Sequence, residues 1–207
     1  MCGRYVLVSN LSRIAEEFNL ADIDSGASLP HGDIRPGQKS ACVIAEGEQN
    51  RLLKMLWGFS LSWSNQHTAK LIINARAETL SEKATFKDPF RRRRCLIPAN
   101  GFYEWSKDKK QFYFSLKDRE LFGLAGLYEE NSEQGKDDTF VIITTSPNNL
   151  VDQIHNRMPV IIPAEKQSLW LDNAKFEKAE LATLFEPYPE HKMEMQQGPY
   201  RLQQAQR

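Results

Sequence analysis

The stretch Arg94-Cys95-Leu96-Ile97-Pro98-Ala99-Asn100-Gly101-Phe102-Tyr103-Glu104-Trp105 combines a β-favouring apolar run with a turn signal. We interpret 95–105 as a strand that passes through Pro98 and the Asn100-Gly101 turn. Further strand-like segments recur along the chain at 3–8, 41–45, 52–58, 71–77, 111–116, 121–128 and 139–145. Many short strands with few helices predict an α+β fold, in which an antiparallel β-rich sheet or barrel is flanked by helices.

The predicted helices and loops are arranged around these strands. Leu11, Ile14 and Phe18 recur at helical spacing, and Ser9 is suited to cap a helix over 9–20. Two further helices are expected at 163–172 and 176–185, and 81–94 is mixed. Loops are expected at 22–38, 59–70 and 130–138, the last a hairpin tip, and a loosely attached tail from about Gln196. No linker is evident, so we expect a single domain over 1–207.

Composition restricts the classes of protein to consider. The 207 residues are 41% apolar, and 27 basic residues balance 27 acidic ones. Net charge therefore gives no reason to expect nucleic-acid binding, and any such site must be a local patch. The three cysteines suggest neither a disulfide framework nor a zinc site, and no apolar run reaches membrane-spanning length. We expect a cytoplasmic monomer with no metal, no cofactor and no membrane contact.

The chain begins Met1-Cys2-Gly3-Arg4. Removal of Met1 would make Cys2 an N-terminal cysteine, with an α-amine and a thiol on adjacent carbons. An aldehyde can condense with that amine to a Schiff base, and the thiol can then close a thiazolidine ring. The plain alternative is a small residue on a frayed terminus.

Three other polar clusters stand out. Asn74, Arg76 and Glu78 alternate in a predicted strand and so project together, as they also would on a solvated face. Glu104 is flanked by aromatic residues, where poor solvation should raise its pKa toward the range useful for proton transfer, unless it reaches solvent. His155 lies in a loop, where a histidine is commonly structural or solvated.

Together these fragments resemble one family. In order they are Cys2-Gly3-Arg4-Tyr5, Trp57-Gly58-Phe59, Asn74-Ala75-Arg76-Ala77-Glu78-Thr79, Arg94 to Trp105, Thr144-Thr145 and His155-Asn156-Arg157-Met158-Pro159. Over about its first 165 residues the chain resembles the SOS response-associated peptidase (SRAP) family of abasic-site processing proteins. The resemblance implies binding of single-stranded DNA, capture of abasic sites as a thiazolidine crosslink through Cys2, and autocatalytic removal of Met1.

The resemblance also implies roles for named residues. Cys2 would supply the amine and then the thiol, Glu104 would move protons, Asn74 would orient Cys2 or the sugar, and His155 would act as acid or base. The expected DNA contacts are Arg4 and Arg76 to phosphates, with Trp57, Trp63 and Thr145, although Trp57 also fits a core position and the arginines also fit salt bridges with a residue such as Glu78. The run Arg91 to Arg94 is either a further DNA contact or a solvated face.

Other classes of function remain open at this point. Cys2, His155 and Glu104 would also suit an N-terminal-nucleophile amidohydrolase or a thiol peptidase, in which the thiol accepts an acyl group. The aromatics and arginines alone would suit a non-covalent single-strand binder. A protein that kept the fold and lost the chemistry is a weaker alternative, because it leaves the joint presence of Cys2, Asn74, Glu104 and His155 unexplained.

Overall fold

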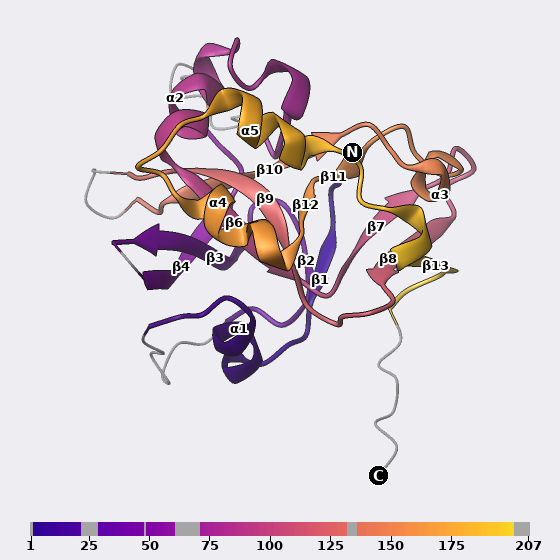
Figure 1. Ribbon diagram of the computed structural model, residues 1–207. Coiled ribbons are helices and arrows are strands. Elements are labelled where there is room, and N and C mark those ends of the chain that lie inside the picture. Colours follow the sequence, from indigo (N-terminus) through magenta and orange to yellow (C-terminus); the bar gives the residue numbers. More distant parts are fainter. Residues whose placement is uncertain (1, 22–28, 48, 61–70, 132–135, 201–207) are drawn as a thin grey trace.

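A computed structural model describes residues 2–21, 29–47, 49–60, 71–131 and 136–200. Two β-sheets form its centre, and short helices cover their outer surfaces (Figure 1). The strands are β1 Tyr5–Leu7, β2 Gly32–Ile34, β3 Lys39–Glu46, β4 Gln49–Trp57, β5 Asn74–Arg76, β6 Arg94–Ala99, β7 Gly101–Trp105, β8 Gln111–Leu116, β9 Phe122–Glu129, β10 Thr139–Thr145, β11 Met158–Pro159, β12 Ile161–Ile162 and β13 Met193–Gln197. The α-helices are α1 Leu11–Glu17, α2 Ala84–Arg92, α3 Asn149–Asp152, α4 Gln167–Leu171 and α5 Lys178–Ala182.

The larger sheet closes into a barrel. Its strands pair in the order β10-β4-β3-β6-β9, and β9 pairs with β10 again, which completes the ring. The second sheet has the order β13-β8-β7-β1-β2. The predicted α+β fold with a β-rich barrel is confirmed. Pairing is mainly antiparallel, but β10 runs parallel to β4 and β5, which the sequence pattern did not indicate.

The stretch 94–105 forms two strands, because β6 belongs to the barrel and β7 to the second sheet. The Asn100-Gly101 pair is therefore a crossing between sheets instead of a hairpin turn. The side chain of Asn100 holds this crossing: its Oδ1 accepts from the backbone N–H groups of Val8 and Ser9, at 2.8 and 3.1 Å. Gly101 is required there, since a Cβ would lie 2.3 Å from the ring of Tyr113.

The remaining local predictions hold in part. Helix α1 is capped by Asn10, whose side chain accepts from Arg13, and not by Ser9. The expected loop 22–38 contains β2, which pairs with β1. β9 and β10 form the expected hairpin. The start expected for a loose tail, Gln196, is wrong, since β13 continues to Gln197; residues 201–207 lie outside the described residues.

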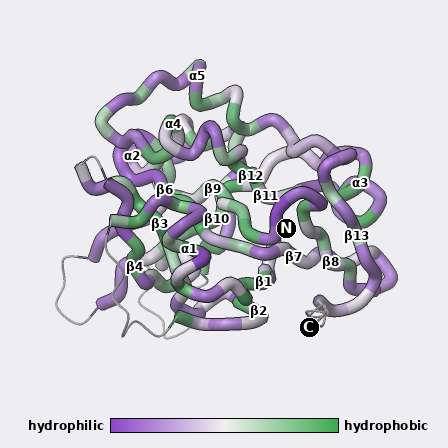
Figure 2. The backbone as a smooth tube through the Cα atoms, turned by 60° about the horizontal axis from the view of Figure 1, so that its bottom comes forward, coloured by the Kyte–Doolittle hydropathy of each residue, from purple (hydrophilic) through white to green (hydrophobic). Residues whose placement is uncertain are grey.

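Apolar side chains fill the barrel and the space between it and the second sheet. Figure 2 shows the hydrophobic segments gathered around β9, β10 and β12, with hydrophilic segments along the outer loops. Buried aromatics contribute a large part of this core, including Phe102, Phe114 and Phe140. In the described part of the chain, no helix is long and apolar enough to cross a membrane.

Candidate active site

Cys2 lies where the two sheets meet. It is separated from β1 of the second sheet by Gly3 and Arg4, and its backbone carbonyl accepts a hydrogen bond from Nδ2 of Asn74, on β5 of the larger sheet, at 3.0 Å. Cys2 is fully buried, so the alternative of a frayed terminus does not hold. Asn74 Oδ1 is buried and has no hydrogen-bond partner among the described residues, which leaves an acceptor available beside Cys2.

Glu104 comes from β7, the strand beside β1. The backbone N–H of Tyr103 donates to the carbonyl of Arg4 at 2.9 Å, which aligns the two strands. Glu104 shares a face of β7 with the core residue Phe102, and it is only 2% exposed. Burial raises the pKa of Glu104 from 4.5 to about 7, as its aromatic neighbours predict. Its carboxyl group can therefore both hold and release a proton near neutral pH.

Burial also acts on the Cys2 thiol. It raises the pKa of Cys2 well above the ordinary value, and the nearby charge of Glu104 raises it further. The thiol is accordingly protonated at neutral pH.

His155 enters from the barrel side, in the loop between α3 and β11. Its Nδ1 lies 3.0 Å from the backbone nitrogen of Arg157 and 3.2 Å from the carbonyl oxygen of the same residue, so according to the tautomer it accepts from the first or donates to the second. Nδ1 lies 4.0 Å from Oε1 of Glu104. Partial burial lowers the pKa of His155 below 6.5, so the ring is neutral at pH 7. The four expected catalytic residues, Cys2, Asn74, Glu104 and His155, are thus brought to one place.

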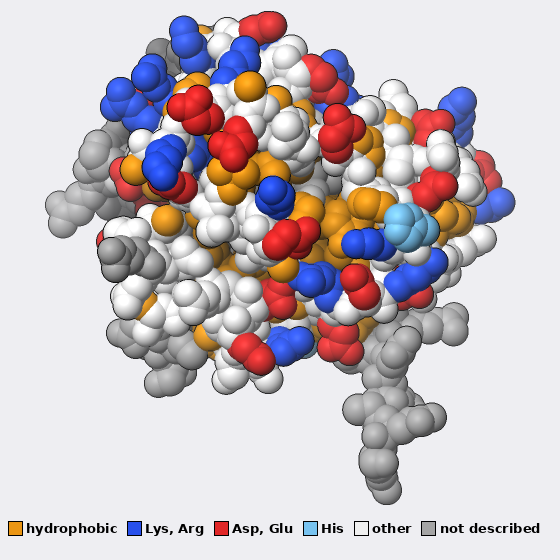
Figure 3. All heavy atoms as spheres, in the orientation of Figure 1, with side chains coloured by type: hydrophobic (Ala, Val, Ile, Leu, Met, Phe, Trp, Pro, Cys, Tyr) orange, Lys and Arg blue, Asp and Glu red, His pale blue; other side chains and the backbone are white. Residues whose placement is uncertain are grey.

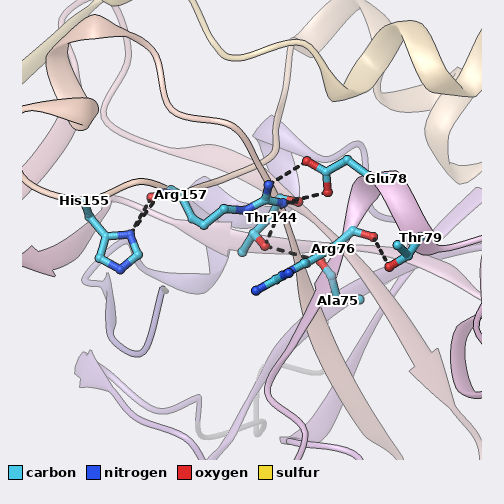
Figure 4. A network of polar contacts seen from close by, with 7 residues as sticks. All are labelled: Ala75, Arg76, Glu78, Thr79, Thr144, His155 and Arg157. Carbon is cyan, nitrogen blue, oxygen red and sulfur yellow. Dashed lines mark hydrogen bonds and ion pairs between the residues drawn. The ribbon is translucent and has the colours of Figure 1, made fainter.

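Arg157 is the centre of a polar network that sequence reasoning missed (Figure 4). Its guanidinium forms two bonds with the carboxylate of Glu78, at 2.6 and 3.0 Å, and donates to the backbone carbonyl of Thr144 at 2.5 Å. Strand β5 ends at Arg76, so Glu78 does not continue its face but lies in the 3-10 turn Ala77–Thr79. Arg157 belongs to the motif His155-Asn156-Arg157-Met158-Pro159, and its place in that motif is the signal by which the sequence could have singled it out.

The basic residues expected at DNA occupy different settings. Arg76 is exposed and makes no ion pair among the described residues, because Glu78 pairs with Arg157 instead. Arg4 lies over the rings of Tyr103 and Trp105, at 5.8 and 5.1 Å, with Asp33 at 3.5 Å. That is the opposite face of β7 from Glu104.

Trp57, for which both a DNA contact and a core position were expected, occupies a core position. It is fully buried, stacks on Phe140, and its indole N–H donates to the carbonyl of Ile73 at 2.9 Å. A tryptophan in an apolar strand is suited to the core or to a DNA contact, and the observed packing places this one in the core. Thr145 is also buried, pairing with Met158, and lines a pocket of about 370 Å³ beside Glu78. Trp63 lies outside the described residues.

The basic run Arg91 to Arg94 also contains both buried and surface residues. Arg94 is fully buried, and its guanidinium donates to five backbone carbonyls, those of Phe90, Arg91, Trp170, Asp172 and Lys175. Arg92 and Arg93 pair with Asp88 on the surface. On the face in Figure 3, basic and acidic side chains are interspersed, so no one charge dominates it.

A larger pocket, of about 590 Å³, lies away from these residues, between the end of α1 and α4. No group of three or more His, Cys, Asp and Glu side chains is placed to hold a metal within the ranges that the structure describes.

The fold and this site define a protein with a buried cysteine at position 2, between two β-sheets and next to an amide, a carboxyl group of raised pKa and a neutral imidazole. The family model described as SOS response associated peptidase (SRAP) matches residues 1–203. The chain belongs to this family.

Relatives and solved structures agree with that assignment. The chain is 40% identical over 205 residues to abasic site processing protein YoqW of Bacillus subtilis, covering 95% of this chain and 92% of the relative. Abasic site processing protein YedK of Escherichia coli is 26% identical over 179 residues, covering 83% and 79% of the two chains. A crystal structure of a protein from Bacteroides thetaiotaomicron superposes with a TM-score of 0.82 at 26% identity, over 95% of this chain and 91% of that one.

Proposed function

We propose that this chain captures abasic sites in single-stranded DNA as a covalent thiazolidine through Cys2, once Met1 has been removed. The observation that carries the proposal is the placement of Cys2 against Asn74 and near Glu104. The names of the relatives support the same substrate, since YoqW and YedK are abasic site processing proteins.

The reaction begins at the amine. The α-amine of Cys2 attacks the C1′ aldehyde of the ring-opened sugar, and a C–N bond forms as the carbonyl oxygen takes up a proton. A proton from Glu104 then lets this hydroxyl leave as water, and the nitrogen passes its remaining proton to the Glu104 carboxylate, which gives an imine. The thiol adds to the imine carbon, so a C–S bond forms and the thiol proton ends on nitrogen. One water is released overall, and Glu104 returns to its starting protonation state.

Each residue has a defined part in this sequence. A carboxyl group with a pKa of about 7 suits both donation and acceptance of the protons. Asn74 holds the Cys2 carbonyl, and its open Oδ1 can accept from the amine or a sugar hydroxyl. With Nδ1 accepting from the Arg157 N–H, His155 would offer Nε2–H toward the sugar or its phosphate, and the exposed Arg76 is available to a flanking phosphate.

The protonated state of the Cys2 thiol favours this function over a thiol peptidase. A peptidase of that kind starts from a thiolate or a thiol paired with a base, whereas burial raises the pKa of this thiol. Condensation of the amine with an aldehyde needs no thiolate. We interpret the word peptidase in the family description as removal of Met1 by the protein itself. A comparison of the intact mass of the expressed wild type with that of the Glu104→Gln variant, which lacks the proton shuttle, tests that step.

A denaturing-gel assay tests the capture. Protein shown by intact mass to lack Met1 is mixed with single-stranded DNA that holds one abasic site, beside the Cys2→Ala and Cys2→Ser variants. We expect a heat-stable band only with Cys2. The Cys2→Ser variant keeps the amine and should give a band only after borohydride reduction of its imine. Met1-free wild-type protein that binds this DNA without a heat-stable band would overturn the proposal.

A further inference from the structure

We propose that Glu78 and Arg157 form a clamp whose role is to position His155 for the covalent step. This inference rests on the proposed function. Neither residue reaches the reacting atoms in the proposal, so both are positioning residues.

The clamp is rigid by construction. Two parallel bonds between guanidinium and carboxylate fix the plane of the Arg157 side chain, and the bond to the Thr144 carbonyl fixes a third direction. The Arg157 side chain is 15% exposed, against 52% for Glu78, so the arginine end is held inside the protein. The bidentate bond also lowers the pKa of Glu78, which keeps the carboxylate charged.

The backbone of Arg157 passes this rigidity to the imidazole. Its backbone nitrogen lies 3.0 Å and its carbonyl oxygen 3.2 Å from Nδ1 of His155. In the proposal the N–H donates to Nδ1, which selects the tautomer with hydrogen on Nε2 and sets the plane of the ring. At the other end of the loop, the N–H of His155 donates to the carbonyl of Val151 at 2.8 Å. The loop is therefore fastened on both sides of the ring, once by α3 and once by the clamp.

The clamp also joins the loop of His155 to β5, the strand whose Asn74 is hydrogen-bonded to Cys2. Glu78 lies in the turn that directly follows β5, and β5 carries Asn74, the partner of the Cys2 carbonyl. Figure 4 shows Glu78 and Arg157 facing each other, with His155 beyond Arg157. Hydrogen bonds thus join Cys2 to Asn74 and Glu78 to Arg157, and the backbone of β5 and its following turn joins Asn74 to Glu78.

A purely electrostatic role for Glu78 makes the opposite prediction. A carboxylate two residues from the exposed Arg76 would repel DNA phosphates, so its neutralisation should tighten DNA binding and leave the covalent step intact. Clamping predicts a slower covalent step at saturating DNA and a His155 ring no longer restricted to one tautomer.

The test compares Glu78→Gln with the matched control Glu82→Gln, an exposed carboxylate four residues along that makes no ion pair among the described residues. The first readout is the imidazole ¹⁵N spectrum of the free protein at neutral pH, with His155 assigned from a His155→Gln spectrum. We expect the Nε2–H tautomer alone in wild type and Glu82→Gln, and averaging of both tautomers in Glu78→Gln.

The second readout is the crosslinking rate constant at saturating abasic DNA, which should fall about tenfold in Glu78→Gln and stay unchanged in Glu82→Gln. Arg157→Lys keeps the charge but loses the bidentate bond, so it should reproduce both effects if Glu78→Gln folds poorly. An unchanged tautomer and rate in both clamp variants would overturn the inference. If wild type forms no crosslink, the proposed function fails, whereas the tautomer spectrum still decides the clamp.

Discussion

Replacement of Glu104 by glutamine should stabilise the protein at alkaline pH while it removes the proton shuttle. Glu104 is 2% exposed, and its pKa is about 7 in the folded chain, against the ordinary value of 4.5 that applies in the unfolded chain. Between these two values the folded chain binds one more proton than the unfolded chain, so the free energy of unfolding falls as pH rises. Above pH 7 this loss is complete.

The size of the effect follows from the two pKa values. A difference of 7 − 4.5 = 2.5 corresponds to about 3 kcal/mol at about 1.4 kcal/mol per unit. Glutamine has nearly the same shape and remains neutral at every pH, so Glu104→Gln avoids this loss. We expect the variant and wild type to differ little in pH dependence below pH 4.5, and the variant to gain about 3 kcal/mol relative to wild type by pH 8.5.

Urea unfolding followed by tryptophan fluorescence at pH 4.5, 6, 7 and 8.5 measures this gain. Glu190→Gln, at an exposed carboxylate, is the control and should follow the wild-type curve. A difference between Glu104→Gln and wild type that is constant across the range would refute the reasoning, because it would show that burial does not perturb the titration of Glu104. A difference that shrinks with rising pH would show that a favourable partner outweighs burial.

Three further predictions follow from the described residues. Arg76→Gln, in a Cys2→Ala background, should weaken DNA binding and reduce the slope of log K against log salt by about 1, and an unchanged slope in fluorescence anisotropy would contradict a phosphate contact. Trp57→Phe removes the indole donor to the Ile73 carbonyl, which keeps the Ile142 N–H at 3.1 Å, and puts a smaller ring in the core, so it should cost about 2 kcal/mol in urea unfolding with DNA affinity unchanged; lost affinity at full stability would count against its core role. Arg94→Lys cannot satisfy five carbonyls and should cost about 3 kcal/mol or more, and a variant of wild-type stability would disprove that role.

Local patterns were sufficient for the fold class and for most strands. Alternation and turn residues placed β3, β4, β8, β9 and β10 near their observed bounds, because these depend on neighbouring residues. The crossing of the chain from one sheet to the other could not be predicted from local sequence patterns. Whether Asn100-Gly101 makes a hairpin or a crossing depends on which strands pair with 94–99 and 101–105, and those partners lie elsewhere in the chain.

Some residues of the candidate site could likewise be found from the sequence, and others could not. Cys2, Asn74, Glu104 and His155 were singled out because each is polar in a setting that favours other residues, and the family motif joined them. The pairing of Glu78 with Arg157 spans 79 residues and leaves no mark on local spacing. Trp57 was ambiguous for a related reason, since an aromatic residue in an apolar strand is equally suited to a core and to a base, and only the position of Phe140 decides.

The burial of Cys2 between two sheets has a consequence for the order of events during synthesis. Its partners Asn74 and Glu104 are encoded far downstream, so the amino terminus leaves the ribosome before the strands that enclose it exist. At about 5 to 20 residues per second, the roughly one hundred residues up to Glu104 take about 5 to 20 seconds. During that interval the residues that would remove Met1 are not yet assembled around it. Removal of Met1 by the protein itself would therefore follow closure of the two sheets over Cys2, and could not begin while the chain is still being made.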